Sequence, residues 1–97
     1  MIEIATVCGM GLGSSMMLAN QIRNMVDEDP NVQAKVQPVD LGSFKSQPSD
    51  IVVTTSGMAK NVQDSPSIVV LIDNLIDKNE VKTKVWAAID EYNAKNS

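Results

Sequence analysis

The 97-residue sequence contains no histidine, and this absence removes the side chain on which much acid–base and zinc chemistry depends. Without imidazole the chain can build neither a Ser-His-Asp triad nor a Cys-His pair. One cysteine with scattered carboxylates is also a poor ligand set for zinc, so we expect no ordinary zinc site. Any nucleophile in this chain must therefore be activated by something other than histidine.

Basic charge and long apolar runs are lacking as well. Eight Lys and Arg residues stand against twelve Asp and Glu residues, a net charge of -4 without a basic stripe, so we expect no nucleic-acid partner. No apolar run approaches the roughly 20 residues that span a bilayer. The first residues, MIEIATVCG, do not resemble a signal peptide. We expect a soluble, cytoplasmic protein with no direct membrane insertion.

What is present fits one folded unit. Apolar residues make up 43% of the chain and charged residues 21%, a balance that favours a globular protein over a disordered one. A chain of 97 residues is long enough for one hydrophobic core and too short for two. We therefore expect a single domain.

Short apolar segments typical of buried strands alternate with amphipathic segments typical of helices. The expected strands are residues 2–7, 32–39, 50–55 and 68–72. The expected helices run from Ser14 to the stop at Asp29-Pro30, over a short piece of 56–67, and over 79–95. Pro38 marks the second strand as an edge strand, and residues 41–49 are interpreted as a polar connection.

This alternation predicts an α/β fold with a parallel sheet and helices on both of its faces. If the first strand is central and the chain winds both ways from it, the strand order is 2-1-3-4. The switch point then lies between strands one and three, where open α/β sheets bind ligands at the carboxyl ends of their strands. Cys8 follows one of these strands and residues 54–57 follow the other, so the two loops should face each other.

The stretch VCGMGLGSS places the only cysteine, Cys8, at the mouth of a loop with three glycines in five residues. Gly9, Gly11 and Gly13 permit backbone conformations that let main-chain N–H groups converge, and the following helix adds the positive end of its dipole. Such a cradle favours anions, including a thiolate: a helix N-terminus lowers the pKa of cysteine from about 8.5 to roughly 3.5–7.5. The sequence therefore predicts a phosphatase-like anion loop with Cys8 as its nucleophile.

Named loop motifs fit this stretch only in part. The Walker form fails because no lysine precedes a Ser or Thr, and the dinucleotide fingerprint fails because Ser14 occupies the place of its last glycine. The pattern Cys-x5-Arg-[Ser/Thr] of cysteine-dependent tyrosine phosphatases is matched by Cys8 and Ser15, but Ser14 replaces the arginine that clamps phosphate in the transition state. A leaving-group acid would best be placed at Asp73, for which we favour a loop or capping role.

The run CGMGLGSSMM after a short first strand resembles the enzyme IIB components of the bacterial sugar phosphotransferase system (PTS), of the phosphocysteine type. The resemblance covers residues 1 to about 26, and within the lactose, ascorbate and galactitol group it is greatest to the ascorbate branch. It implies one IIB domain over residues 1–97, with no metal or organic cofactor. Cys8 would take phosphate from a phosphohistidine of a IIA partner and pass it to sugar, L-ascorbate, bound by a membrane IIC partner. The phosphate-binding residues would be Gly9, Met10, Gly11, Leu12, Gly13, Ser14 and Ser15.

Two other functions stay open at this point. One is a low-molecular-weight cysteine phosphatase or arsenate-reductase-like enzyme, and the other is a plain anion- or nucleotide-binding module. Steady hydrolysis of an aryl phosphate that depends on Cys8 would support the first. Ligand binding that survives Cys8→Ser would support the second.

Some side chains outside the loop have two interpretations each. Met16 and Met17 are either covered by adjacent loops or form an apolar rim that docks partners. Residues 54–56 either hydrogen-bond the loop or merely end their strand, and we favour the second. Lys60 is interpreted as a solvated lysine and Trp86 as half-buried.

Overall fold

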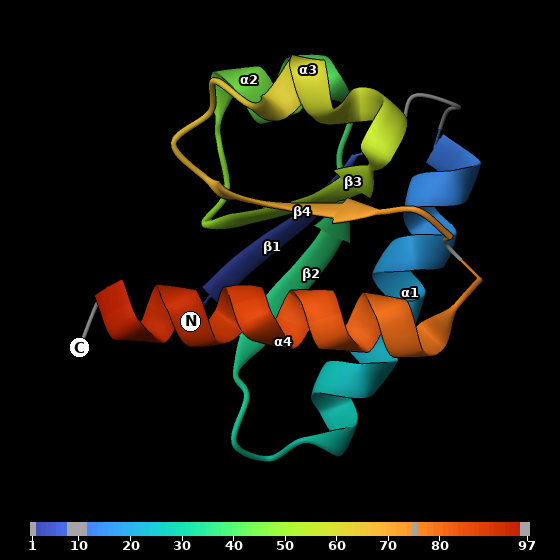
Figure 1. Cartoon of the computed structure of the whole chain (residues 1–97), viewed down its shortest axis with the longest axis vertical. Coiled ribbons are helices and arrows are strands. Elements are labelled where there is room, and N and C mark those ends of the chain that lie inside the picture. Colours follow the sequence, from blue (N-terminus) through green and yellow to red (C-terminus); the bar gives the residue numbers. More distant parts are fainter. Residues whose placement is uncertain (1, 8–11, 75, 96–97) are drawn as a thin grey trace.

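The computed structural model describes residues 2–7, 12–74 and 76–95, with the backbone alone for residues 12–15. Strands and helices alternate along these residues (Figure 1). The elements are β1 (Ile2–Val7), α1 (Leu12–Glu28), β2 (Ala34–Pro38), α2 (Leu41–Ser46), β3 (Ile51–Thr55), a 3-10 turn η1 (Ser56–Met58), α3 (Ala59–Val62), β4 (Ile68–Ile72) and α4 (Lys78–Lys95). The strands predicted from apolar runs are confirmed, with ends shifted by up to two residues.

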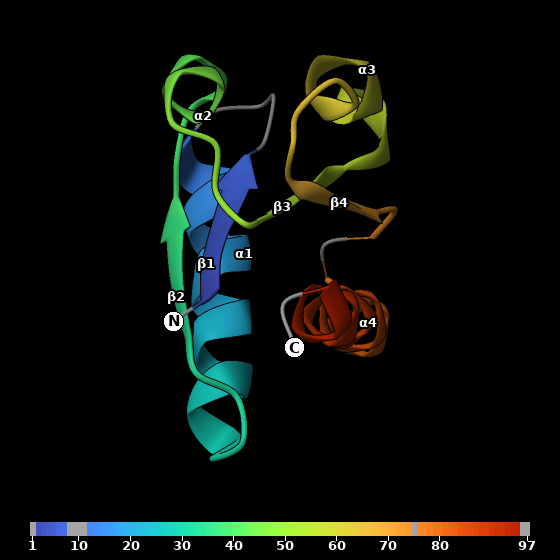
Figure 2. The ribbon, with the colours of Figure 1, turned by 90° about the vertical axis from the view of Figure 1, so that its left-hand side faces the viewer.

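The strands form one parallel sheet in the order β2-β1-β3-β4, which confirms the predicted topology (Figure 2). β1 is central because its run of Ile and Val side chains is buried on both faces of the sheet. β2 lies at one edge, where Pro38 lacks a backbone donor without breaking the sheet. In the register between β1 and β3, Val7 lies opposite Thr54. The carboxyl ends of strands one and three therefore lie side by side, as predicted.

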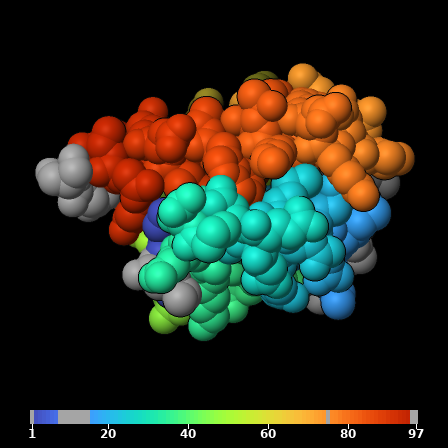
Figure 3. Space-filling model, turned by 90° about the horizontal axis from the view of Figure 1, so that it is seen from below, coloured from blue at the N-terminus to red at the C-terminus, as the bar shows by residue number. Residues whose placement is uncertain are grey.

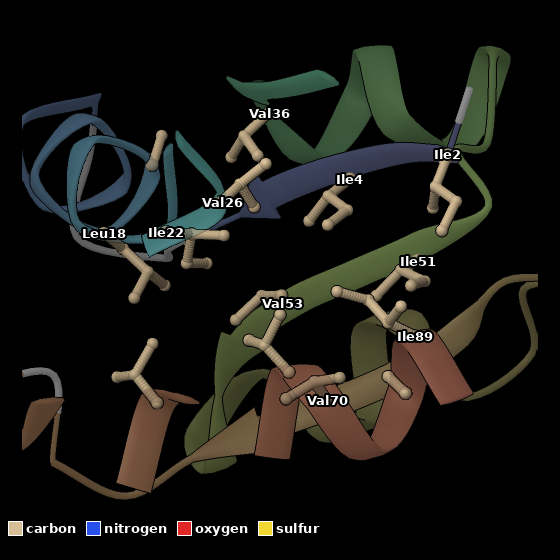
Figure 4. Packing of buried hydrophobic residues seen from close by; sticks show 14 of the residues in the cluster. Ile2, Ile4, Leu18, Ile22, Val26, Val36, Ile51, Val53, Val70 and Ile89 are labelled. Carbon is tan, nitrogen blue, oxygen red and sulfur yellow. The ribbon is translucent and has the colours of Figure 1, made fainter. Parts of the chain in front are cut away.

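Helices cover both faces of the sheet, because successive side chains of each strand point to opposite sides. On one face, strand residues such as Ile4, Val53 and Val70 pack with Leu18 of α1 and Ile89 of α4 (Figure 4). A smaller cluster on the other face joins strand residues to α2 and α3; its buried members are Ala5, Val7, Phe44, Val52 and Val62. The larger cluster holds α1 against the sheet, and the smaller one holds the end of β1 at Val7, where the candidate site begins.

The second strand is shorter than predicted, because its start belongs to a turn. The N–H of Val32 donates to the carbonyl of Asp29 at 3.1 Å, and the N–H of Asn31 donates to the carboxylate of the same residue at 3.0 Å. These bonds carry the chain out of α1, so that β2 begins only at Ala34. The predicted stop of α1 at Asp29-Pro30 is confirmed, because the helix ends at Glu28.

The interpretation of residues 41–49 as a polar connection is wrong, because residues 41–46 form α2. Asp40 caps this helix, with its Oδ2 accepting from the N–H of Ser43 at 3.3 Å. Phe44 enters the smaller core cluster and is almost fully buried. A six-residue helix with only two large apolar side chains, Leu41 and Phe44, has no readable periodicity, so the Asp40 cap was the available signal.

α4 is amphipathic, with Val81, Val85 and Ile89 buried against the sheet. Trp86 is half-buried as predicted, and its Nε1 donates to Asp29 Oδ2 at 3.2 Å. The rest of α4 is largely polar and forms a long outer face of the molecule (Figure 3). Within the described ranges, no helix combines the length and apolar character that crossing a membrane requires.

Candidate functional site

The predicted anion loop connects the carboxyl end of β1 to the start of α1. β1 ends at Val7 and α1 begins at Leu12, so Cys8, Gly9, Met10 and Gly11 lie outside the described residues. Leu12, Gly13, Ser14 and Ser15 form the first turn of α1, and the structure describes their backbone alone. The roles assigned to these eight residues stay predictions. The structure does describe the elements around them, which are the end of β1, the start of α1 and the neighbouring end of β3. We call these elements the frame of the loop.

The amino end of α1 gives this frame its electrostatic character. The helix runs for 17 residues, so its aligned peptide dipoles place partial positive charge and free N–H groups at its first turn. No acidic residue occurs in that turn. Helix N-termini of this kind hold phosphate and thiolate anions without any basic side chain.

Thr54 forms part of the neighbouring wall of this frame. It lies beside Val7, the last residue of β1, and both are fully buried. In the described part of the chain, Thr54 Oγ1 has no hydrogen-bond partner. An unpaired buried hydroxyl costs about 1–3 kcal/mol. Among the described residues, Thr54 therefore ends its strand with an unpaired buried hydroxyl at the switch point between β1 and β3.

Ser56 and Asp73 join the ends of the next two strands. Ser56 Oγ donates a hydrogen bond to Asp73 Oδ1, which connects the residue after β3 to the residue after β4. Lys84 Nζ lies 3.7 Å from Asp73 Oδ2. The Asp73 carboxylate therefore connects the loop after β4 to the loop after β3 and to α4. These contacts agree with the structural role favoured for Asp73 over that of a leaving-group acid.

Glu80 fixes the loop between β4 and α4. Its carboxylate accepts from the N–H groups of Asp73 at 2.8 Å and Asn74 at 3.0 Å, and from Lys84 Nζ at 2.7 Å. The hydrogen bond from Lys84, followed by that from the Asp73 N–H, lowers the pKa of Glu80 to about 2. Sequence reasoning missed this arrangement, although Asp77-x-x-Glu80 is a helix-capping signal: Asp77 Oδ1 accepts from the Glu80 N–H at 3.2 Å.

The only arginine in the chain, Arg23, is held away from the loop. Its guanidinium donates to the carbonyl of Val36 at 2.7 Å and to Asn20 Oδ1 at 3.3 Å. Val36 lies in β2, and Arg23 lies on the fourth turn of α1. No arginine is therefore available to supply the clamp that Ser14 lacks. Lys60 of α3 is exposed, as expected for a solvated lysine.

Exposed apolar side chains lie near the same edge of the molecule. Met16 and Met17, in the first half of α1, are 52% and 44% exposed, so the idea that adjacent loops cover them is wrong. Ile76, which sequence reasoning did not single out, is 79% exposed in the loop before α4. The start of α1 and this loop lie on one side of Figure 1. Large exposed apolar side chains at one edge are suited to contact with another protein.

The described side chains show no metal centre, since no group of three or more His, Cys, Asp and Glu residues among them could hold an ion. Comparison with known proteins adds one match. A family model described as "PTS system, Lactose/Cellobiose specific IIB subunit" matches residues 3–86. No curated protein matches the chain.

Proposed function

We propose, from the premise that the chain belongs to the PTS lactose/cellobiose-type IIB family, that it carries phosphate as a thiophosphate ester on Cys8. A IIB subunit of this family is a phosphoryl carrier in sugar uptake, with IIA and IIC partners. The observation that supports the assignment to Cys8 is the position of residues 8–11 in the sequence, between the buried end of β1 and the amino end of α1. A thiolate and a phosphoryl group are both anions that this position stabilises.

Phosphate moves through two displacements at phosphorus. The Cys8 thiolate attacks the phosphohistidine of IIA, an S–P bond forms, the N–P bond breaks, and the imidazole leaves and takes up a proton. A sugar hydroxyl held by IIC then attacks the same phosphorus and gives its proton to a base on IIC, an O–P bond forms, and the S–P bond breaks to return the thiolate. Backbone N–H groups of residues 9–15 would hold the phosphate oxygens between the two steps. The chain needs no histidine of its own, because the donor imidazole belongs to IIA.

Arg23 distinguishes a carrier from a phosphatase. A phosphatase stabilises the transition state of hydrolysis with an arginine, and the single arginine here is bound to Val36. A loop that binds phosphate through backbone groups alone can accept and release it without promoting attack by water. This observation favours transfer to a sugar over the phosphatase alternative.

The sugar we propose is L-ascorbate, on the strength of the CGMGLGSSMM run, and the place of action is the cytoplasm. The family model is named for lactose and cellobiose, so these disaccharides are the competing substrates. The exposed Met16 and Met17 side chains would form the apolar rim that meets IIA and IIC in turn.

Transfer assays with membranes that contain one IIC at a time test this proposal. Wild-type protein, phosphorylated through IIA, should phosphorylate ascorbate, and Cys8→Ser should transfer nothing. Transfer to lactose or cellobiose alone would retain the carrier function and overturn the choice of sugar. Sugar phosphorylation that persists in Cys8→Ser would overturn the role of the thiol.

A further inference from the structure

One side of α4 and the outer edge of β4 form an open groove that the proposed phosphotransfer does not use. Its walls are β4 and five α4 residues, and its volume is about 580 Å³. β4 and α4 run side by side at the front of Figure 1, and the outer surface of α4 is continuous in Figure 3. The α4 residues are Lys84, Ala87, Ala88, Glu91 and Lys95.

In this groove, charged side chains prevent the outer edge of β4 from pairing with another strand. The N–H of Ile68 donates to Asp50 at 3.0 Å, so the alternate residues Val69 and Leu71 turn their backbone groups outward. Lys84 Nζ covers the outward carbonyl of Leu71 at 2.8 Å. Charged side chains on an edge strand discourage addition of a further strand. The helix side of the groove, rather than the strand, is therefore the surface left for a partner.

On this side of α4 the charged residues are ordered so that an antiparallel copy of the helix would bring opposite charges next to each other. Ala87 and Ala88 mark the centre. Lys84 stands three residues before the pair and Glu91 three after it, whereas Glu80 stands seven before and Lys95 seven after. Spacings of three, four and seven residues place these side chains on one face of a helix. We call these six residues the α4 stripe.

We propose that the α4 stripe binds a second copy of this chain, with the two α4 helices packed antiparallel about Ala87 and Ala88. In this arrangement Lys84 faces Glu91 of the partner subunit, and Lys95 faces Glu80 of the partner subunit. Each of these pairs occurs twice because a twofold interface is made of the same residues on both copies. Ala88 is buried against the sheet and Ala87 is exposed, so it is the small Ala87 side chain that lets the helix axes approach closely at the centre.

A second copy fits this surface better than an unrelated charged protein does. The stripe holds two acidic and two basic residues, so it is neutral although the whole chain carries a charge of -4. Its centre is apolar and its ends are charged, as in protein interfaces generally. Glu80 and Lys84 already bind each other, and Glu91 lies 3.8 Å from Lys95. The new pairs therefore join existing ion pairs into a network, and the association should be weak and sensitive to salt.

Sedimentation equilibrium of the full chain at concentrations up to about 1 mM measures this association. The decisive variant is Glu91→Lys/Lys95→Glu, which exchanges two charges within the stripe. It preserves composition, net charge and an i,i+4 ion pair, but every pair across the interface becomes one of like charge. Like charges across an interface oppose association, so the dissociation constant should rise at least about tenfold. High salt should weaken the wild-type dimer and reduce the difference in dissociation constant between the wild type and this variant.

A steric variant tests the same geometry independently. Ala87 is exposed and is not a member of the core cluster, so Ala87→Arg should separate the helices without unfolding the chain, whereas Asn93→Arg, on the opposite exposed side of α4, should leave the dimer intact. Circular dichroism confirms that each variant is folded. A wild-type chain that stays monomeric over this range overturns the proposal. A dimer that persists unchanged in both the charge-exchange and Ala87→Arg variants also overturns it.

Discussion

The Arg23 guanidinium donates a hydrogen bond to the Val36 carbonyl at 2.7 Å, and this contact commits the only arginine of the chain to the outer edge of the sheet. A cysteine-dependent phosphatase would need such a group beside its phosphate. Ser14→Arg should restore it and increase the hydrolysis rate of the phosphorylated protein at least about tenfold, because one transition-state donor is worth that much or more. The decay of the phosphoprotein, followed by mass spectrometry, measures this rate.

The matched control is Asn24→Arg, which adds the same charge at an exposed position farther along α1. It should leave the lifetime of the phosphoprotein unchanged. An equally long lifetime in Ser14→Arg would show that the missing arginine is not what preserves the phosphate.

Thr54 and Thr6 are equally buried hydroxyls on neighbouring strands, but they differ in their partners. Thr54 Oγ1 has none among the described residues, whereas Thr6 makes a polar interaction. Thr54→Val should therefore leave the free energy of unfolding unchanged or raise it by about 1 kcal/mol, and Thr6→Val should lower it by about 1 kcal/mol or more. Urea denaturation of both variants measures the difference. A large loss of stability in Thr54→Val alone would contradict this account.

Phe44 is the buried residue of α2 and packs in the smaller core cluster on the sheet. Phe44→Ala should lower the free energy of unfolding by about 3–5 kcal/mol, because it empties a filled core position. Lys45→Ala, at the exposed neighbour on the same helix, should change it by less than about 0.5 kcal/mol. Equal effects of the two substitutions in urea denaturation would show that α2 does not depend on its core contact.

The lowered pKa of Glu80 predicts that the free energy of unfolding depends on pH. Its pKa falls from 4.5 to about 2 on folding, chiefly through the hydrogen bond from Lys84, so its contribution is present above pH 4.5 and is lost as the pH falls towards 2. Glu80→Gln should be less stable than wild type at neutral pH, and the difference should shrink on acidification through this window. Denaturation curves across the window measure it. A difference that does not change with pH would place the effect of Glu80 in packing rather than in its charge.

Met16 and Met17 should matter to partners and not to folding, since both are exposed on α1. Met16→Gln/Met17→Gln should slow phosphate transfer from IIA several-fold and change the free energy of unfolding by less than about 0.5 kcal/mol. Asn24→Gln is the control for an exposed change on the same helix. A normal transfer rate in the double variant would show that Met16 and Met17 are not part of the surface that docks IIA.

The sequence was most informative where one residue type decides a local structure. The short β-branched run of residues 68–72 favours a strand, which the structure confirms, and Asp29-Pro30 ends α1 as expected. α2 was missed because Phe44 finds its core partners across the sheet, in segments remote along the chain. A short polar segment gives no periodicity from which to infer such contacts.

The sequence predicts an anion loop between the first strand and the first helix, but not the contacts of the elements around it. Glycines, a single cysteine and a following helix indicate an anion loop wherever they occur together. The binding of Arg23 to Val36, and of Ser56 to Asp73, depends on how separate elements approach in space. No local pattern encodes those distances, so the wall around the loop emerged only from the fold.

Phosphorylation of Cys8 is tested most directly by the intact mass of the protein after incubation with phosphoenolpyruvate, the general phosphotransfer proteins and a cognate IIA shown to be phosphorylated. The account predicts one added phosphoryl group on the wild-type chain and none on Cys8→Ser. Absence of the group from the wild type, or its presence on Cys8→Ser, would contradict the phosphocysteine carrier.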